Sequence, residues 1–179
     1  GYIHIPDTDT PSFVIWSHGL LSDAFSKKQI NLADRLIEQN IGCIRFHHRG
    51  CGESEGLLEA TDLLSRKKDI ISAFEYLKKN FNLKKTGLFG SSMGGAASIF
   101  SYSDINPEAI AVAAAPVFGG TMKSSSNNSL ENMMQETGLP KEFFEKNTDF
   151  DLIDQLRDIK NILIFHGEDD EIVPFENAS

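Results

Sequence analysis

Short runs of consecutive apolar residues alternate along the chain with longer stretches in which apolar residues recur at helical spacing. Strands that are apolar on consecutive positions are typical of a parallel sheet covered by helices on both faces. The runs predict strands at residues 2–5, 13–17, 42–46, 86–89, 109–113 and 161–165. The helical stripes predict helices at residues 27–39, 61–80 and 92–102. This order predicts an α/β fold, a three-layer sandwich around a mostly parallel sheet.

One segment interrupts the alternation of strands and helices. Between the strand that ends near Val117 and the strand that starts at Asn161 lie about forty residues, far more than a plain crossover between parallel strands needs. The insertion, at about residues 120–158, contains a polar tract at 124–129 and short helical patterns at 130–136 and 140–146. We interpret it either as a surface excursion or as a mobile lid.

Composition narrows the class of protein. The 179 residues suit a single domain, and 40% hydrophobic with 24% charged residues excludes wholesale disorder and a fibrous protein. A net charge of −9 without a basic block argues against nucleic acid as a partner. The longest apolar stretch is about half of the ~20 residues that cross a bilayer, so no membrane span is predicted. Only two cysteines and no signal-peptide pattern favour a cytoplasmic protein.

The sharpest chemical signal is the sequence Gly-Ser-Ser-Met-Gly at residues 90–94, a G-x-S-x-G motif. It lies where the predicted strand 86–89 meets the predicted helix 92–102, which is the context of a nucleophile elbow. Ser92 would stand on a tight turn, and Gly90 and Gly94 would leave room for it. We therefore expect Ser92 to be a nucleophile, although the bare motif also occurs by accident.

A second turn, His18-Gly19, directly follows the predicted strand 13–17. Such a turn would place the N–H of Leu20 opposite the nucleophile, with the N–H of Met93 as a second donor to an oxyanion. We interpret His18 as a structural residue that orders this turn, and not as a base. The alternative is a sharp loop without a catalytic role.

Two further loops carry polar residues after predicted strands. Residues 47–54 contain His47 and His48 beside Cys51, but no further ligand cluster supports a metal site. Residues 168–171 are four consecutive acidic residues after the predicted strand 161–165. By themselves they would indicate a solvated turn or a calcium-binding patch. A carboxylate in this position would also suit the third member of a catalytic triad.

Taken in order, these motifs resemble the α/β-hydrolase superfamily, most closely its esterase, monoacylglycerol-lipase-like and serine-aminopeptidase-like branch. The family pattern is H-G, D-x-R-G-x-G-x-S, G-x-S-x-G and H-G-x-x-D-x-x-V-P, which here corresponds to residues 18–19, 47–54, 90–94 and 166–174. The resemblance covers nearly the whole chain. It implies Ser92 as nucleophile, Asp170 as the acid with Asp169 as the fallback, and the amides of Leu20 and Met93 as the oxyanion hole.

Two departures from the family pattern stand out. Position 47 is His where the family has Asp, and the roles of His47 and His48 stay open. The resemblance also places the base after the acid, yet all five histidines precede Asp170. We therefore expect the chain to be an incomplete hydrolase domain, without its last strand and helix, whose catalytic histidine lies beyond Ser179. The rival explanation is a natural non-catalytic relative.

The sequence thus predicts a serine hydrolase that cleaves carboxylic esters of small or medium acyl groups through an acyl-enzyme on Ser92. A peptidase or amidase of the same fold is the nearest alternative, because the acyl-enzyme chemistry is shared. A binding protein that keeps the fold without turnover is the alternative from another class. No motif implies a metal or organic cofactor, and the expected partner is a small-molecule ester or amide.

Overall fold

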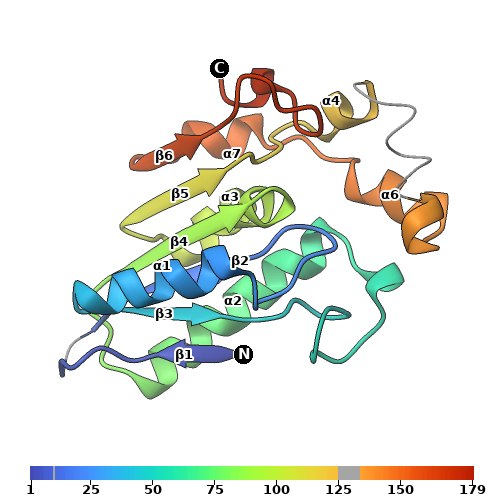
Figure 1. Cartoon of the computed structure of the whole chain (residues 1–179). Helices are drawn as coiled ribbons and strands as arrows, with labels where there is room; N and C mark the ends of the chain where they lie inside the picture. Colours follow the sequence, from blue (N-terminus) through green and yellow to red (C-terminus); the bar gives the residue numbers. More distant parts are fainter. Residues whose placement is uncertain (10, 125–133) are drawn as a thin grey trace.

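The structure, a computed structural model, describes residues 1–9, 11–124 and 134–179 (Figure 1). Within these residues the strands form one six-stranded sheet in the order β1-β3-β2-β4-β5-β6. β1 is antiparallel to β3, and the remaining neighbours are parallel. The bounds are β1 Tyr2–His4, β2 Ser12–Ser17, β3 Ile41–Arg45, β4 Thr86–Ser91, β5 Ala109–Ala113 and β6 Ile162–Phe165. The predicted mostly parallel sheet is confirmed.

Helices cover both faces of the sheet, as the three-layer prediction requires (Figure 1). One face carries α1 (Lys27–Glu38), and the other carries α2 (Leu63–Asn80), α3 (Met93–Ile105) and α7 (Ile153–Arg157). Two short helices, α4 (Gly119–Ser124) and α6 (Lys141–Asn147), lie beyond the carboxyl ends of the strands. Short 3-10 turns occur at η1 (Leu58–Ala60) and η2 (Phe175–Asn177). No described helix is both long and apolar enough to span a bilayer.

The core is divided by the sheet into two unequal clusters. The larger cluster fills the α2 and α3 side, where the small residues Ala96 and Ala97 are fully buried and let α3 approach the sheet. The smaller cluster lies under α1 and is built around Trp16, Ala33 and Cys43. Alternate side chains of β2 therefore enter opposite clusters, with Ile15 on the α2 side and Trp16 on the α1 side.

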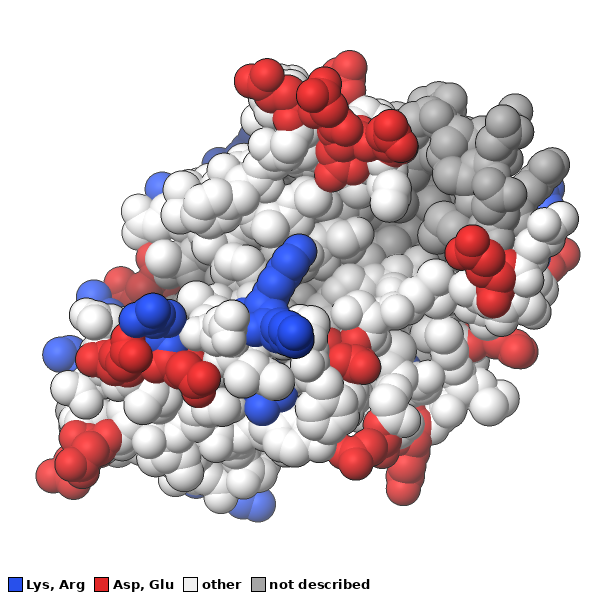
Figure 2. All heavy atoms as spheres, in the orientation of Figure 1, with Lys and Arg blue, Asp and Glu red and all other residues white. Residues whose placement is uncertain are grey.

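The last strand differs from the expectation that every strand is buried on both faces. In β6, Leu163 and Phe165 are 55% and 53% exposed. They border a groove of about 600 Å³ that continues over β5 and β4 to Leu32 and Leu36 of α1. α1 covers only the other half of this face, and charged side chains are sparse over the uncovered half (Figures 1 and 2). The strand is apolar as predicted, but no described element packs over this part of it.

Candidate active site

Ser92 occupies the turn between β4 and α3 in a strained conformation. Its backbone φ is 52° and ψ is −127°, a combination that non-glycine residues rarely adopt. The N–H of Ser92 donates to the carbonyl oxygen of Ala113 at 2.8 Å, which ties the turn to the end of β5. The residue is half-buried, and no described residue hydrogen-bonds to its Oγ. The hydroxyl is thus presented at the carboxyl edge of the sheet.

Two glycines allow the backbone to make this turn. A Cβ at Gly90 would overlap the carbonyl group of Gly94, and a Cβ at Gly94 would overlap the carbonyl oxygen of Ser17. Both positions therefore need glycine, because neighbouring backbone atoms lie too close to leave room for a Cβ. This agrees with the prediction from the motif. Gly94 brings the start of α3 directly against the end of β2.

The end of β2 places the His18-Gly19 turn beside Ser92. A Cβ at Gly19 would lie 3.5 Å from the Cβ of Ser92 and 3.5 Å from the carbonyl oxygen of Ser91, which is ordinary van der Waals distance. Among the described turns and loops, no hydrogen bond uses the N–H of Leu20 or of Met93. The N–H of Met93 opens α3, where the first N–H groups lack partners within the helix and favour negative charge.

His18 is buried and hydrogen-bonded at both ring nitrogens. Its Nδ1 donates to the carbonyl oxygen of Gly19 at 2.7 Å, and its Nε2 accepts the backbone N–H of His48 at 3.0 Å. Burial, with the nearby His48 and Arg66, lowers the pKa of His18 to about 3. The ring is therefore neutral at pH 7 and ordered within the turn.

In the acidic loop after β6, the two candidate aspartates differ in burial and in hydrogen bonding. Asp170 is half-buried, and its Oδ1 accepts the N–H groups of Ile172 and Val173 at 2.9 and 2.8 Å. Asp169 is exposed. His166, at the start of this loop, donates from Nε2 to the carbonyl oxygen of Val173 at 2.8 Å. The loop thus fixes the carboxylate of Asp170 through its own backbone.

Strand pairing brings the acidic loop to the same edge of the sheet as Ser92. The N–H of Ala114 donates to the carbonyl oxygen of Phe165 at 2.8 Å, so the ends of β5 and β6 are adjacent. Ser92 is tied to β5 by its bond to Ala113. The structure therefore brings Leu20 and Met93 next to Ser92, while Asp170 approaches from a strand two positions away in the sheet.

None of the five histidines hydrogen-bonds to Ser92 Oγ. His18 and His48 are bonded within the buried turn, and His166 is bonded to the acidic loop. His47 accepts the N–H of Ala24 at 3.2 Å, and His4 accepts from the Arg45 guanidinium at 3.0 Å. A general base for Ser92 is not found among these side chains.

In the described part of the chain, no group of three or more His, Cys, Asp or Glu side chains converges where it could bind a metal ion. Neither the His47-His48-Cys51 loop nor the acidic loop therefore forms a metal site there. Acidic side chains gather at the end of the molecule formed by the chain's last segment (Figure 2). Their exposed members include Glu168, Asp169 and Glu171. They spread over the surface and do not enclose a shared site.

The two ends of the insertion are held together next to the site. The N–H of Leu152 donates to the carbonyl oxygen of Val117 at 2.8 Å, and the N–H of Gly119 donates to that of Phe150 at 2.9 Å. The side-chain oxygen of Asn177 accepts the N–H of Val117 at 2.9 Å, which links this neck to the segment after the acidic loop. Residues 125–133, part of the predicted lid, lie outside the described residues.

The second half of the insertion is packed down. Phe143, Phe144 and Asn147 of α6 are buried, and the Asn147 Nδ2 donates to the carbonyl oxygen of Thr61 at 3.0 Å. This part of the segment therefore covers the chain between η1 and α2. A cavity of about 330 Å³ is lined in part by Trp16, Gly19 and Ser91.

Comparisons with known proteins bear on the fold and the family of the chain. The family model described as serine aminopeptidase, S33, matches residues 9–158. The search of curated proteins found no significant match.

Three solved structures illustrate the similarity. Est1E from Butyrivibrio proteoclasticus, solved with ferulic acid bound, matches with a TM-score of 0.83 at 20% identity, over 99% of this chain and 78% of its own. The Pyrococcus furiosus esterase Pf2001 matches with 0.73 at 20%, over 94% and 66%. A Xanthomonas campestris α/β serine hydrolase described as without lid matches with 0.68 at 19%, over 98% and 68%. The chain thus spans about two thirds to four fifths of their lengths, within the α/β-hydrolase fold. With the family model covering most of its length, this chain belongs to the serine aminopeptidase S33 family of serine hydrolases.

Proposed function

We propose that the chain carries the acylation site of a serine hydrolase that cleaves carboxylic esters of small or medium acyl groups. The observation that carries the proposal is the strained Ser92, whose hydroxyl has no hydrogen-bond partner among the described residues. It adjoins the N–H groups of Leu20 and Met93, which no described turn or loop uses. Strained turns of this kind expose the nucleophile in serine hydrolases. Ester cleavage is favoured over amide cleavage by the esterases among the similar structures, one of them with ferulic acid bound.

In the proposed reaction, Ser92 Oγ attacks the ester carbonyl carbon while its proton passes to a general base. The negative charge that develops on the carbonyl oxygen is held by the N–H groups of Leu20 and Met93, and each such donor is worth ~3 kcal/mol. The alcohol leaves with the proton, and water then releases the acid from Ser92 by the reverse sequence. Asp170 orients the base. That the base is a histidine beyond Ser179 stays a prediction.

Peptide or amide cleavage is the second candidate, and the name of the matching family, serine aminopeptidase, supports it. Both substrates would share the acyl-enzyme, so the shape of the pocket decides between them.

The test is an intact mass spectrum after exposure to a fluorophosphonate, which adds covalently to an activated serine. Like every labelling experiment below, it uses a chain that continues beyond Ser179 and includes the predicted base. We expect one adduct on the chain, its loss in Ser92→Ala, and its retention in the matched control Ser91→Ala. Failure of the unsubstituted chain to react would contradict an activated Ser92 and favour the non-catalytic binding protein. Retention of the adduct in Ser92→Ala would assign the nucleophile to another residue.

A further inference from the structure

A buried chain of hydrogen bonds leads from helix α2 to the turn beside Ser92. The His48 ring lies between two partners, with Nδ1 3.2 Å from Asp69 Oδ2 and Nε2 2.8 Å from Ser17 Oγ. Ser17 and His48 are both fully buried. The order serine, histidine, aspartate is that of a catalytic triad, but a substrate cannot reach it. These residues can therefore act only through the position of their neighbours.

The position of the His48 backbone in turn fixes the ring of His18. The N–H of His48 donates to His18 Nε2 at 3.0 Å, which leaves the proton of the neutral His18 ring on Nδ1. That Nδ1–H donates to the carbonyl oxygen of Gly19 at 2.7 Å. In the same peptide unit the N–H belongs to Leu20, and in a planar trans peptide it points away from the carbonyl. Holding the Gly19 carbonyl on one side therefore directs the Leu20 N–H to the other.

Both imidazoles must be neutral for this arrangement, because each accepts a hydrogen bond at Nε2. Burial is the main cause that lowers the pKa of His48 to about 4 and that of His18 to about 3. With Nδ1 of His48 donating to the carboxylate of Asp69, its Nε2 is the acceptor for the Ser17 hydroxyl. Both rings thus carry their proton on Nδ1.

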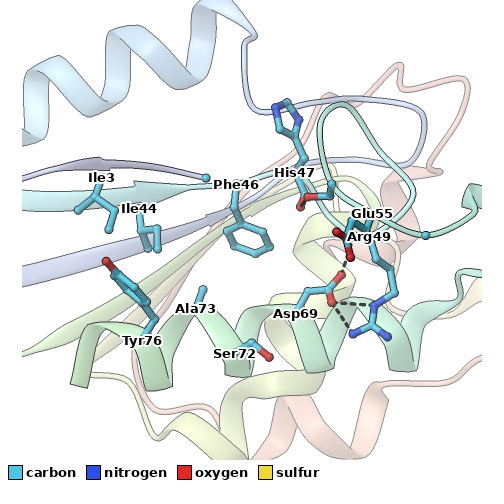
Figure 3. A pocket seen from close by; sticks show the side chains of 13 residues that line it. Ile3, Ile44, Phe46, His47, Arg49, Glu55, Asp69, Ser72, Ala73 and Tyr76 are labelled. Carbon is cyan, nitrogen blue, oxygen red and sulfur yellow. Dashed lines mark hydrogen bonds and ion pairs between the residues drawn. The ribbon is translucent and has the colours of Figure 1, made fainter. Parts of the chain in front are cut away.

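Asp69 is also bound by Arg49 at the surface of the molecule. Arg49 donates to its Oδ1 from Nε at 2.8 Å and from Nη2 at 2.6 Å, and the backbone N–H of Arg49 donates to Oδ2 at 3.0 Å. Figure 3 shows Asp69 reaching from α2 toward Arg49 at the border of a cavity of about 790 Å³. The carboxylate therefore has one partner facing inward, His48, and one facing outward, Arg49.

We propose that His48 is a positioning residue of the active site: held between Ser17 and Asp69, it fixes His18, which in turn points the Leu20 N–H at the oxyanion. This inference rests on the proposed function for the role of Leu20. His48, whose role the motif pattern left open, would then have a structural role beside the active site. Substrate does not touch His48, so its effect should fall on the rate of the chemical step and not on binding.

The first measurement is the ¹⁵N NMR spectrum of the histidine side chains, which distinguishes the two neutral tautomers and the charged ring. At pH 7 we expect His18 and His48 to be neutral with the proton on Nδ1, and we expect His18 to become a mixture of tautomers in His48→Phe. A proton on Nε2 of either ring, a charged ring, or an unchanged His18 in His48→Phe would overturn the proposal. This measurement needs no enzymatic activity, so its failure is distinct from failure of the proposed function.

The second measurement separates the rate constant of fluorophosphonate addition to Ser92 from the affinity for the reagent. We expect His48→Phe to lower the rate constant about tenfold to hundredfold with unchanged affinity, since complete loss of one oxyanion donor costs about 10²–10³. Asp69→Asn should act in the same direction and serves if His48→Phe does not fold. Arg49→Gln, which removes the outward partner but leaves the His48 contact, should stay within twofold. Equal losses in Arg49→Gln and His48→Phe would assign the effect to the ion pair and overturn the role of His48.

Discussion

At the scale of single residues, the site depends on the absence of a side chain at Gly94. A Cβ there would overlap the carbonyl oxygen of Ser17, so either β2 or the start of α3 would have to move. We expect Gly94→Ala to lower the free energy of unfolding by about 1–3 kcal/mol, the usual cost of overpacking, and to abolish labelling of Ser92. Urea denaturation and fluorophosphonate labelling measure the two effects.

Gly87 provides the matched control in the strand just before the elbow. A Cβ there would meet the carbonyl oxygen of Ala109 and Cγ2 of Val14 at 3.6 Å, which is ordinary contact. Gly87→Ala should therefore change the free energy of unfolding by less than about 1 kcal/mol and leave the labelling intact. Similar losses in both variants would show that general sensitivity of the β4–α3 region, and not the close approach at Gly94, is responsible.

Among the elements, α6 shows how firmly the insertion is docked. Phe143 is 1% exposed and lies one turn before Asn147, which bonds both to the carbonyl oxygen of Phe143 and to that of Thr61. We expect Phe143→Ala to lower the free energy of unfolding by about 3–5 kcal/mol, the usual cost of removing a buried phenylalanine ring. The exposed neighbour Glu142→Ala should cost less than about 0.5 kcal/mol. A small effect of Phe143→Ala would mean that α6 detaches freely, as a mobile lid would.

The sequence predicted the long elements well because their apolar patterns extend over several turns or over whole strands. It missed α4 and α7, which have six and five residues and are too short to show a helical period. It could not anticipate the pairing of His48 with Asp69, because the two side chains come from different elements and meet only through the packing of α2 on the sheet. Likewise, Arg66 lies among apolar positions of α2, fully buried, where its Nη1 donates to the carbonyl oxygen of His18 at 3.0 Å.

For the molecule as a whole, the groove over β4, β5 and β6 is the largest departure from a covered sheet. Exposed apolar surface of this kind promotes association. Leu163, 55% exposed, borders the groove, and we expect Leu163→Lys to make the protein less prone to associate without loss of stability. Sedimentation velocity over a range of concentrations, with a thermal melt of each variant, measures this.

The control for Leu163→Lys is Leu64→Lys on α2. Leu64 is 47% exposed and does not border the groove, so the substitution adds the same charge at a similar exposure elsewhere. It should leave association unchanged. Equal improvement in the two variants would attribute the effect to net charge, and no improvement in Leu163→Lys would show that the groove does not drive association.

The strained backbone conformation of Ser92 depends on contacts with strands that are distant in the sequence. The turn is held by groups distant in sequence: the carbonyl of Ala113 on β5 receives the Ser92 N–H, and the end of β2 lies against Gly94. A peptide with the elbow sequence alone would have none of these restraints and would relax to an ordinary conformation, because strain persists only where its surroundings enforce it. The strained conformation that would make Ser92 a nucleophile therefore depends on three assembled strands, and a chain that has formed its helices but not its sheet carries a serine like any other.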